Sequence, residues 1–555
     1  MSQVTTNDQQ RPGLLAQAER IAEDFVLSPE NVRRVTGHFV RQMKDGLTNH
    51  RVWQLPSFVR SVPTGAETGT FLAIDLGGSN CRICLVELHG NSTFAVTQRR
   101  YRVPPEVMVC QRYQPLFDFI AEKLSGFLVA HPVPNGRDHL RGETEEQRNT
   151  PYRLGFTFSF TCEQTSLAGG NLIRWDKDWD IPDAVGRDPC IMLQESIDKL
   201  GLPVSVTVLA NDSVGTLLTR SYAAGQKTSS TLAAIIVGTG TNAAYVEKVS
   251  NIHRLGATGG QSDEIMVINT EWGCLDDKME VLPRTPFDDE IDETSTDPGV
   301  QMFEKRVSGL YLGELLRLAL VRLVRQGASE MTFDEESQLF RRQGIDSSFL
   351  SELAVLSSKN DSSQTVKLIT DKLLAKNVTA LDVKAIQLLS AAIVRRAARL
   401  AGASLAAIII QSGRLDQRPL ASKDPNTEVT EYQASETIQT PMTTSVGRFC
   451  HNLSLLWRRI LKFFTGLNSS SKGRFLPADS SKPTQGCCPQ DQIIDIGADG
   501  SLIEFYPTFE TDMRGAMQEV PEIGPDGERR VRIGLAKDGS GVGAALMAQA
   551  ALRQK

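Results

Sequence analysis

VTVLANDSVGTLLT, residues 206–219, is the most informative stretch of the sequence. A Val-rich apolar run ends abruptly at Asn211 and Asp212, and a run that fits a helix follows, with Gly215 inside it. The pattern predicts a buried strand that delivers a carboxylate to the carboxyl edge of a sheet, where open α/β sheets bind ligands. Asp212 is therefore a candidate general base. The alternative is that Asp212 only caps the helix that begins near Ser213.

Two other stretches share a strand–glycine turn–strand design. FLAIDLGGSNCRICLVE, residues 71–87, turns at Gly77-Gly78, and TLAAIIVGTGTNAAYV, residues 231–246, turns at Gly238-Thr239-Gly240. Two such units about a domain apart predict an internal duplication, with the phosphates of a nucleotide clamped between the turns. Each hairpin taken alone is better explained as an ordinary tight turn.

The first turn has polar neighbours that suit a nucleotide. Ser79 and Asn80 add hydrogen-bond donors to the glycine amides, and Asp75 could hold Mg²⁺ through water. We expect no metal site made by the protein alone, because the Mg²⁺ would arrive bound to the phosphates of the nucleotide.

Residues 154–180, LGFTFSFTCEQTSLAGGNLIRWDKDWD, alternate apolar and hydroxyl residues and then open into a glycine-containing loop. Ser159 and Lys177 are the polar groups expected to face a ligand. Trp175 and Trp179 could form an apolar wall or belong to the core. Further along, Glu304 lies in a predicted helix that runs from Gln301 through Val324. It is either a structural residue that the helix dipole favours or an acceptor for a ligand hydroxyl.

The remaining segments are predicted as structural elements. We expect two amphipathic helices within 14–48 and a solvated acidic loop at 287–297. Residues 387–410 are predicted to form a helix with Arg395, Arg396 and Arg399, followed by an apolar strand. Toward the C-terminus we expect a strand–turn–strand at 493–506, and a glycine turn that leads into a helix at 538–552. Residues 412–490 are rich in Ser, Thr, Pro, Gln and Asn, and are expected to be a largely disordered insert.

Composition narrows the class of protein. A chain of 555 residues is too long for one core, so two or more lobes are expected. A net charge of -6 argues against a nucleic-acid-binding protein but permits an anionic substrate in a local pocket.

The nine cysteines are scattered and do not have the spacing of a zinc site. Cys81 and Cys84 lie in an apolar run, and we expect their thiols to be buried. The polar N-terminus shows no secretory signal, and no apolar run approaches the length of a membrane span. A reducing, cytoplasmic location is expected.

Five stretches in order, DLGGSNCRIC, LGFTFSF, NDSVGT, GTGTNAAY and NTEWG, resemble the hexokinase family, and within it the fungal glucokinases. The resemblance covers roughly residues 13–411 and 491–552. It implies a two-lobed α/β fold of the actin-like ATPase (ribonuclease H-like) type. The implied parts are N-terminal helices on the large lobe (1–70), a small lobe with the sugar loop (71–210), the first part of the large lobe (211–411), the insert (412–490), and the rest of the large lobe with a C-terminal helix returning to the small lobe (491–555).

The resemblance also implies roles for single residues. Asp212 would take the proton from the 6-hydroxyl of a hexose, with glucose as the expected substrate, as that hydroxyl attacks the γ-phosphate of MgATP, with Lys177 as a second catalytic residue. The residues that match sugar contacts are Ser159, Asp176 (at a threonine of the family pattern), Lys177, Asn211, Asn242, Glu271 and Glu304. Those that match the nucleotide site are Asp75, Gly77, Gly78, Ser79, Asn80, Thr239, Gly309, Ser347 and Ser501. Carboxylates and amides suit a ring of neutral hydroxyls, and phosphoryl transfer asks mainly for positioning and charge stabilisation.

Several departures from the family pattern fall in the sugar loop. Thr161 stands where the family has Pro, Asp176 replaces a threonine and Asp178 replaces a glycine. An added negative charge beside Asp212, Glu271 and Glu304 opposes closure of a cleft. The alternative function is therefore a weakly active or inactive, sugar-sensing regulatory relative. A third, an actin-like ATPase without a sugar substrate, would leave the sugar-contact set without a purpose.

The insert contains a predicted basic amphipathic helix, RFCHNLSLLWRRILKFF at residues 448–464. Its apolar face and its Arg and Lys residues suit a membrane surface or the groove of a partner protein. Docking of this helix onto the large lobe of the same chain is an alternative of equal weight.

Overall fold

The computed structural model of the chain describes residues 13–78, 80–132, 151–175, 179–225, 231–256, 264–327, 329–415 and 493–552. They belong to the first of two units into which the chain divides, residues 1–418 with 488–555. The predictions for Ser79, Asp176, Lys177 and the helix at 448–464 lie outside the described residues. Within the described ranges, no helix is long and apolar enough to cross a membrane.

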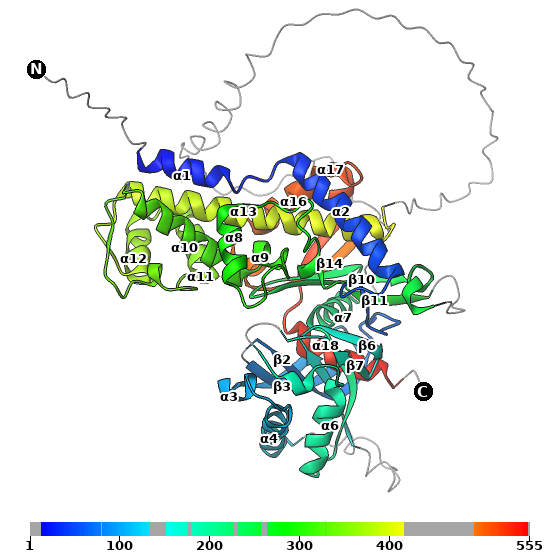
Figure 1. The fold of residues 1–555 in the computed structure, drawn as a ribbon. Coiled ribbons are helices and arrows are strands. Elements are labelled where there is room, and N and C mark those ends of the chain that lie inside the picture. The colour runs from blue at the N-terminus through cyan, green and yellow to red at the C-terminus, as the bar shows by residue number, and fades with distance from the viewer. Residues whose placement is uncertain are drawn as a thin grey trace, which may run out of the picture. The chain divides into compact units, whose positions relative to one another are not determined.

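The first sheet, of which β2 and β3 are labelled in Figure 1, has five strands in the order β4-β3-β2-β5-β8. β2, β3 and β4 are antiparallel neighbours, whereas β5 and β8 run parallel to β2. One face packs on helices α4 and α6 through apolar residues that alternate along the strands. The bounds are β2 Thr68–Gly77, β3 Asn80–His89, β4 Phe94–Arg102, β5 Tyr152–Phe158, β8 Val204–Ala210, α4 Gln114–Ala130 and α6 Pro189–Lys199.

The second sheet repeats this topology with one added edge strand, in the order β1-β11-β10-β9-β14-β15. Here β9, β10 and β11 are antiparallel neighbours, and β14 and β15 run parallel to β9. The same sequence of pairings in both sheets confirms the predicted duplication. The bounds are β1 Leu55–Pro56, β9 Ala233–Val237, β10 Thr241–Lys248, β11 Ile265–Asn269, β14 Ile494–Asp499 and β15 Val531–Leu535.

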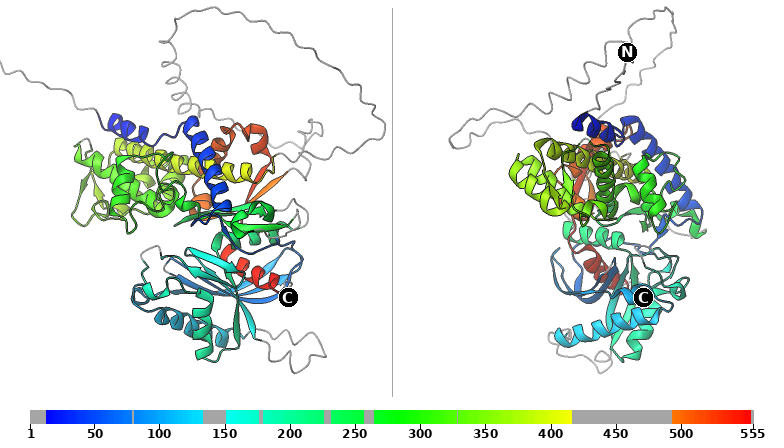
Figure 2. Two further views of the ribbon diagram at one scale, coloured as in Figure 1. Left: turned by 45° about the vertical axis from the view of Figure 1, so that its right-hand side comes forward. Right: turned by 60° about the vertical axis from the view of Figure 1, so that its left-hand side comes forward.

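Two helices that follow the last strand of each repeat lie between the sheets. α7 (Asp212–Ala224) leaves β8 and packs on β9, β10 and β14 of the second sheet. α18 (Gly539–Ala550) leaves β15 and packs on β2, β5 and β8 of the first sheet (Figure 2). The two helices touch where a Cβ on Gly543 would collide with the backbone of Gly215. This close crossing requires glycine on both helices.

A layer of helices covers the other face of the second sheet. The two predicted N-terminal helices, α1 (Leu14–Glu23) and α2 (Pro29–Thr48), are confirmed and pack on the long helix α13 (Ala380–Gln411). The other described elements are α3 Pro105–Met108, α8 Pro286–Thr294, α9 Glu304–Val307, α10 Gly309–Arg325, α11 Ser347–Ser358, α12 Ser362–Leu373, α15 Ser501–Phe505, α16 Phe509–Gln518, α17 Gly524–Arg529, β6 Cys162–Ser166, β7 Gly169–Leu172, β12 Thr332–Phe333 and β13 Ala375–Lys376.

The prediction of one helix from Gln301 through Val324 is wrong, because the chain breaks at Ser308 into α9 and α10. The break lets the backbone N–H of Gly309 donate to the carbonyl of Gly238 at 2.7 Å. A Cβ on Gly309 would lie only 2.8 Å from that same oxygen. The start of α10 is thus fitted against the second glycine turn.

Two predicted strands are helical instead. The apolar run that ends at Ile410 is the end of α13, which is buried on all sides over this stretch and so lacks the one-sided periodicity that distinguishes a surface helix from a strand. The second half of 493–506 is α15, because Gly500, with φ of 108°, turns the chain into a helix. A Cβ on Gly500 would collide with the carbonyl of Val237, so this turn also touches the end of β9.

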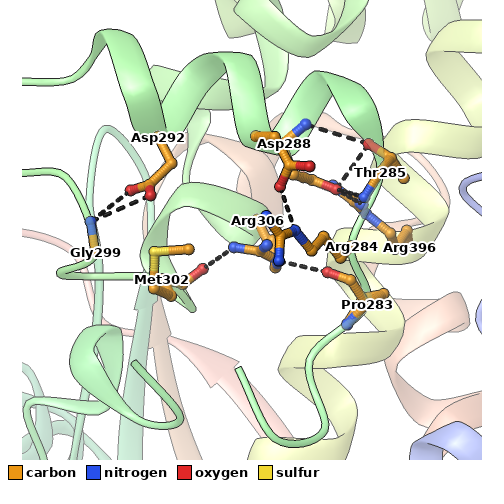
Figure 3. A network of polar contacts seen from close by, with 10 residues as sticks. Pro283, Arg284, Thr285, Asp288, Asp292, Gly299, Met302, Arg306 and Arg396 are labelled. Carbon is orange, nitrogen blue, oxygen red and sulfur yellow. Dashed lines mark hydrogen bonds and ion pairs between the residues drawn. The ribbon is translucent and has the colours of Figure 1, made fainter. Parts of the chain in front are cut away.

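The acidic stretch 287–297 is not a solvated loop, since most of it forms α8. Thr285 and Asp288 make a capping box at its start, and Asp288 is buried. Both oxygens of Asp288 accept hydrogen bonds from Arg396 at 2.7 Å (Figure 3). Burial alone would raise the pKa of Asp288, but the charge of Arg396 holds that pKa below its ordinary value. The sequence pattern of acidic residues could not show this partner, which lies 108 residues away.

The short helix α9 is held by two buried cations next to Glu304. Arg306 donates to the carbonyls of Pro283 at 2.6 Å and Met302 at 2.7 Å (Figure 3). The ammonium of Lys305 is 2% exposed and bonds the side chain of Asp292 at 2.8 Å and Ser295 Oγ at 2.9 Å. These contacts fix the backbone that carries Glu304.

Asp277 lies beside this helix and is strongly perturbed. Its Oδ1 accepts from the backbone N–H of Met302 at 2.9 Å. Burial raises the pKa of Asp277 to about 6, against the opposing charges of Arg174 and Lys305. The folded protein therefore favours the protonated carboxyl more than the unfolded chain does.

The Arg396–Asp288 pair gives a stability prediction. Arg396→Met leaves the buried Asp288 without its principal partner and should lower the free energy of unfolding by roughly 3–5 kcal/mol. The matched control is Arg395→Met, because Arg395 is 66% exposed and its ion pair with Asp512 is long, at 3.4 Å. The control should cost less than about 1 kcal/mol. Urea unfolding of both variants measures the difference, and equal losses would contradict a dominant role for the buried pair.

A second prediction concerns pH. Because the folded-state pKa of Asp277 is raised, its contribution to stability is present at low pH and is lost as pH rises through about 6. Asp277→Asn should be more stable than the parent above pH 6, and the difference should shrink toward pH 4. Thermal unfolding from pH 4 to 8 tests this, with Asp526→Asn as control, since Asp526 is 94% exposed. A pH-independent difference for Asp277→Asn would refute the assignment.

Candidate active site

A cavity of about 360 Å³ lies where the carboxyl edges of β2, β5 and β8 meet the turn between β9 and β10. It is of a size that suits a small ligand. The predicted residues that line it are Asp75, Gly77, Gly78, Asn80, Ser159, Asn211, Asp212, Thr239, Asn242, Glu271 and Glu304. Residues separated by more than 200 positions in the sequence are thus brought to one place.

Asp212 is the first residue of α7, directly after β8. The N-cap of this helix is Asn211, whose side-chain oxygen accepts from the backbone N–H of Ser213 at 2.9 Å. Asp212 Oδ1 also accepts from this N–H, at 2.8 Å, so its carboxylate is tethered to the helix start. Asn211 therefore takes the capping role that was the alternative for Asp212, and the carboxylate of Asp212 lines the cavity.

A chain of side-chain hydrogen bonds links three residues that line the cavity through the amide of Asn269. Asn242 Nδ2 donates to the side-chain oxygens of Asn269 at 2.9 Å and of Asn211 at 3.3 Å. Asn269 Nδ2 in turn donates to Glu271 Oε1 at 2.8 Å. Asn211, Asn242 and Glu271 come from three different elements, and the hydrogen bonds fix their relative orientation.

The two glutamates are held by backbone geometry. Glu271 adopts a left-handed conformation, with φ of 47°, which costs of order 1–3 kcal/mol for a residue other than glycine. Glu304 begins α9, and its Oε1 accepts from the backbone N–H of Thr241 at 3.0 Å. Both glutamates line the cavity, so Glu304 has the position expected of a ligand acceptor.

The first glycine turn is linked to a carboxylate–guanidinium pair. Arg82 Nε and Nη2 donate to Asp75 Oδ2 at 2.9 and 2.5 Å, and both residues line the cavity. Trp179 Nε1 donates to the carbonyl of Gly78 at 2.7 Å. Trp179 stacks on Trp175 in the core of the first sheet, so these tryptophans support the turn and are not a cavity wall.

The remaining nucleotide candidates lie around a second cavity. Ser347 and Ser501 begin α11 and α15 and line a space of about 670 Å³, together with Phe505 and the facing sides of α11 and α12. Gly309 stands between the cavities, since a Cβ on it would meet both Gly238 O and Ser347 Oγ at 2.8 Å. Thr239 lines the first cavity. The helix starts favour anions on this side.

Several cavity residues were not predicted from the sequence. Arg82, Gln301 and Thr161 line the first cavity, and Asn269 orients two of its residues. Arg82 lies in the quoted motif DLGGSNCRIC at the spacing that puts it on the same face as Asp75 and Asn80, so strand periodicity could have found it. The hydroxyl of Thr161 is buried and has no hydrogen-bond partner in the described part of the chain. Lys177 and Asp176 lie outside the described residues.

Mg²⁺ would be held by few protein groups. No cluster of three or more metal-binding side chains occurs within the described ranges. Both contacts of Arg82 use Oδ2 of Asp75, so Oδ1 can accept a hydrogen bond from water bound to an ion. The residues present fit an ion that is carried by the nucleotide.

Comparison with known proteins agrees with this geometry. Two family models described as hexokinase match residues 17–222 and 232–550. The chain is 38% identical to a glucokinase of Aspergillus niger, covering 98% of each chain, and 33% identical to Glucokinase-1 of Saccharomyces cerevisiae, covering 96% of each. A solved hexokinase from Schistosoma mansoni, complexed with glucose, superposes with a TM-score of 0.70 at 29% identity over 98% of this chain and all of that one. The architecture is the two-lobed, actin-like α/β fold of these enzymes. The chain belongs to the hexokinase family.

Proposed function

We propose that the protein is an ATP:hexose 6-phosphotransferase and that glucose is its substrate. The observation that carries the proposal is the position of Asp212, which shares one cavity with the carboxylates of Glu271 and Glu304 and with residues of both glycine turns. Relatives named glucokinase match nearly the whole chain. No observation on the described residues favours the regulatory alternative.

The proposed reaction is a single in-line transfer. Asp212 takes the proton of the sugar's 6-hydroxyl, whose oxygen bonds to the γ-phosphorus while the bond from that phosphorus to the β,γ-bridging oxygen breaks. The products are a hexose 6-phosphate and ADP. Mg²⁺ bound with ATP would neutralise phosphate charge, and we expect Asp75, which lines the cavity, to hold its water.

The proposed sugar site consists of Ser159, Asp176, Lys177, Asn211, Asn242, Glu271 and Glu304. Ionised carboxylates accept hydrogen bonds and amides both accept and donate, which suits the alternating donors and acceptors of a pyranose. The proposed nucleotide site consists of Asp75, Gly77, Gly78, Ser79, Asn80 and Thr239 at the phosphates, with Gly309, Ser347 and Ser501 toward the second cavity. The second cavity is partly apolar and has room for a nucleoside.

Other aspects of the function stay predictions. A reducing, cytoplasmic location is supported by the six described cysteines, which all carry free thiols, including the buried Cys81 and Cys84. The lobe boundaries and a membrane-surface or protein partner for residues 448–464 also stay predictions, and no nucleic-acid partner is expected.

The role of Asp212 is tested by Asp212→Asn, which keeps the shape of the side chain and removes the base. Turnover should fall by about 10²–10⁴-fold, and the Kd for glucose should change by less than about fivefold. A coupled assay and calorimetry with glucose measure the two effects, with Asp198→Asn on α6 as a control. Turnover within tenfold of the parent would refute the general-base role. Glucose binding by a parent protein without turnover would instead favour the regulatory alternative.

The position of the second turn is tested by Gly309→Ala. The added methyl group would press on Gly238 and Ser347 and displace the turn. The KM for MgATP should rise by about tenfold or more, a loss of about 1.4 kcal/mol, while the Kd for glucose stays unchanged. Gly126→Ala in α4 is the matched control, because nothing lies within 4 Å of a Cβ at that position. An unchanged KM for MgATP would show that the nucleotide does not depend on this turn.

A further inference from the structure

A pocket of about 590 Å³ lies between α1 and α10, in the helical layer that covers the second sheet. We call it the arginine pocket. Positions three and four residues apart share one face of a helix, and the lining follows this spacing on both helices. Its walls include Arg20, Ile21 and Asp24 at the end of α1 and Arg322, Arg325 and Gln326 at the end of α10.

The arginine pocket is remote from the cavity that contains Asp212. Gly309, the first residue of α10, touches the second glycine turn, whereas the pocket lies at the last turn of the same helix. The 17 residues of α10, at a rise of about 1.5 Å each, separate its two ends by roughly 25 Å. No described residue lines both spaces, so a small ligand of one does not reach the other.

The three arginines of the pocket have no anionic partner. Their side chains are exposed, and none forms an ion pair or a side-chain hydrogen bond with a residue of the described ranges. Arg322 lies over the ring of Phe287 at 5.5 Å, a contact that leaves its charge in place. Asp24 is the one carboxylate of the described lining, and it is not ion-paired with them. Three guanidiniums against one carboxylate leave an excess of two positive charges.

The helix dipoles explain only part of this arrangement. Arg20 is in the last turn of α1, and Arg322 and Arg325 are in the last turn of α10, where a cation is favourable. The dipoles do not require the cations of two helices to line one space. A sphere of the pocket's volume is about 10 Å across, close to the Debye length at about 0.1 M salt, so the three like charges repel one another across it. A bound anion would remove this repulsion.

The lining indicates the chemistry of the anion. The guanidinium group presents a planar fork of donors that fits two oxygens of a phosphate. Gln326 adds an amide that can donate to a further oxygen, and Ile21 is the one apolar residue of the described lining. A ligand is therefore polar over most of its surface. The volume lies in the range of small-molecule sites and exceeds what a single phosphate fills.

We propose that the arginine pocket binds a small molecule with two or more phosphate groups, which join the arginine of α1 to those of α10. The inference goes beyond the proposed function and does not depend on it, because the pocket shares no described residue with the cavity of Asp212. The competing explanation is that the arginines only compensate the dipoles of the two helix ends.

Calorimetric titration of the full-length protein with inorganic tripolyphosphate, without added Mg²⁺, tests the site. The variant Arg20→Gln/Arg325→Gln removes one arginine from each wall and leaves Arg322 in place. Its Kd for tripolyphosphate should be at least about tenfold higher than that of the parent. The control Arg33→Gln/Arg34→Gln loses the same charge from exposed positions of α2 that do not line the pocket, and its Kd should stay within about twofold of the parent's.

A third variant tests the pocket through a gain of affinity, which a folding defect does not produce. Asp24→Asn removes the carboxylate that repels a phosphate, so its Kd for tripolyphosphate should be about threefold lower than the parent's. Inorganic orthophosphate should bind the parent at least about tenfold more weakly than tripolyphosphate, because one phosphate engages fewer guanidiniums. Saturating tripolyphosphate should raise the thermal midpoint of the parent and leave that of Arg20→Gln/Arg325→Gln unchanged.

The outcomes separate this inference from the competing explanation and from the proposed function. Equal Kd values for the two double variants would show that the arginines serve only the helix ends. A parent that does not bind tripolyphosphate, or a Kd that Asp24→Asn leaves unchanged, also overturns the inference. The KM for MgATP should stay at the parent's value in Arg20→Gln/Arg325→Gln, and a rise would contradict a separate site. A parent that binds tripolyphosphate in this pocket but does not turn over hexose would refute the proposed function alone.

Discussion

The close crossing of α7 and α18 is the constraint on which the site depends. Gly215 and Gly543 let the two helix backbones touch, and each helix packs on the sheet of the other repeat. Because α7 begins at Asp212 and α18 follows the turn that contains Asp538, this crossing brings the carboxyl edges of both sheets to the same cavity. A larger side chain at either glycine would separate the base from the turns that face it.

Buried cations that do not line the cavity hold the helix that carries Glu304, one of the carboxylates of its lining. Lys305 and Arg306 anchor the backbone of α9 through several hydrogen bonds each, and Arg396 neutralises the neighbouring Asp288. These charges do not touch the cavity. They hold in place a short helix that has too few residues to be stable alone. The carboxylate of Glu304 is consequently positioned by the ion pairs of Lys305 and the backbone hydrogen bonds of Arg306, the two residues that follow it in α9.

The local sequence pattern correctly predicted the elements that have one buried and one exposed face or a clear turn signal. The strand before Asp212, the glycine hairpins and the amphipathic helices α1 and α2 all have a periodicity or a turn signal that a window of ten residues contains. The errors occurred where long-range contacts decide. Helix α8 depends on Arg396, the break between α9 and α10 depends on Gly238, and the end of α13 is buried all round. For the site, the quoted motifs contained Arg82 and Asn269, but only the register of the strands and the amide contacts show what these residues face.

The amide chain explains how a site of this kind can read the stereochemistry of a sugar. Asn269 does not line the cavity, yet its oxygen accepts from Asn242 and its nitrogen donates to Glu271. An amide that gives its donor to one neighbour and its acceptor to the other leaves each neighbour a defined set of free hydrogen-bonding positions. Glu271 combines this hydrogen bond from Asn269 with a left-handed backbone conformation, so both its backbone and its carboxylate are fixed locally. In the proposed sugar site, Asn269 would therefore affect the discrimination between epimers without lining the cavity, because it fixes which donors and acceptors Asn242 and Glu271 present.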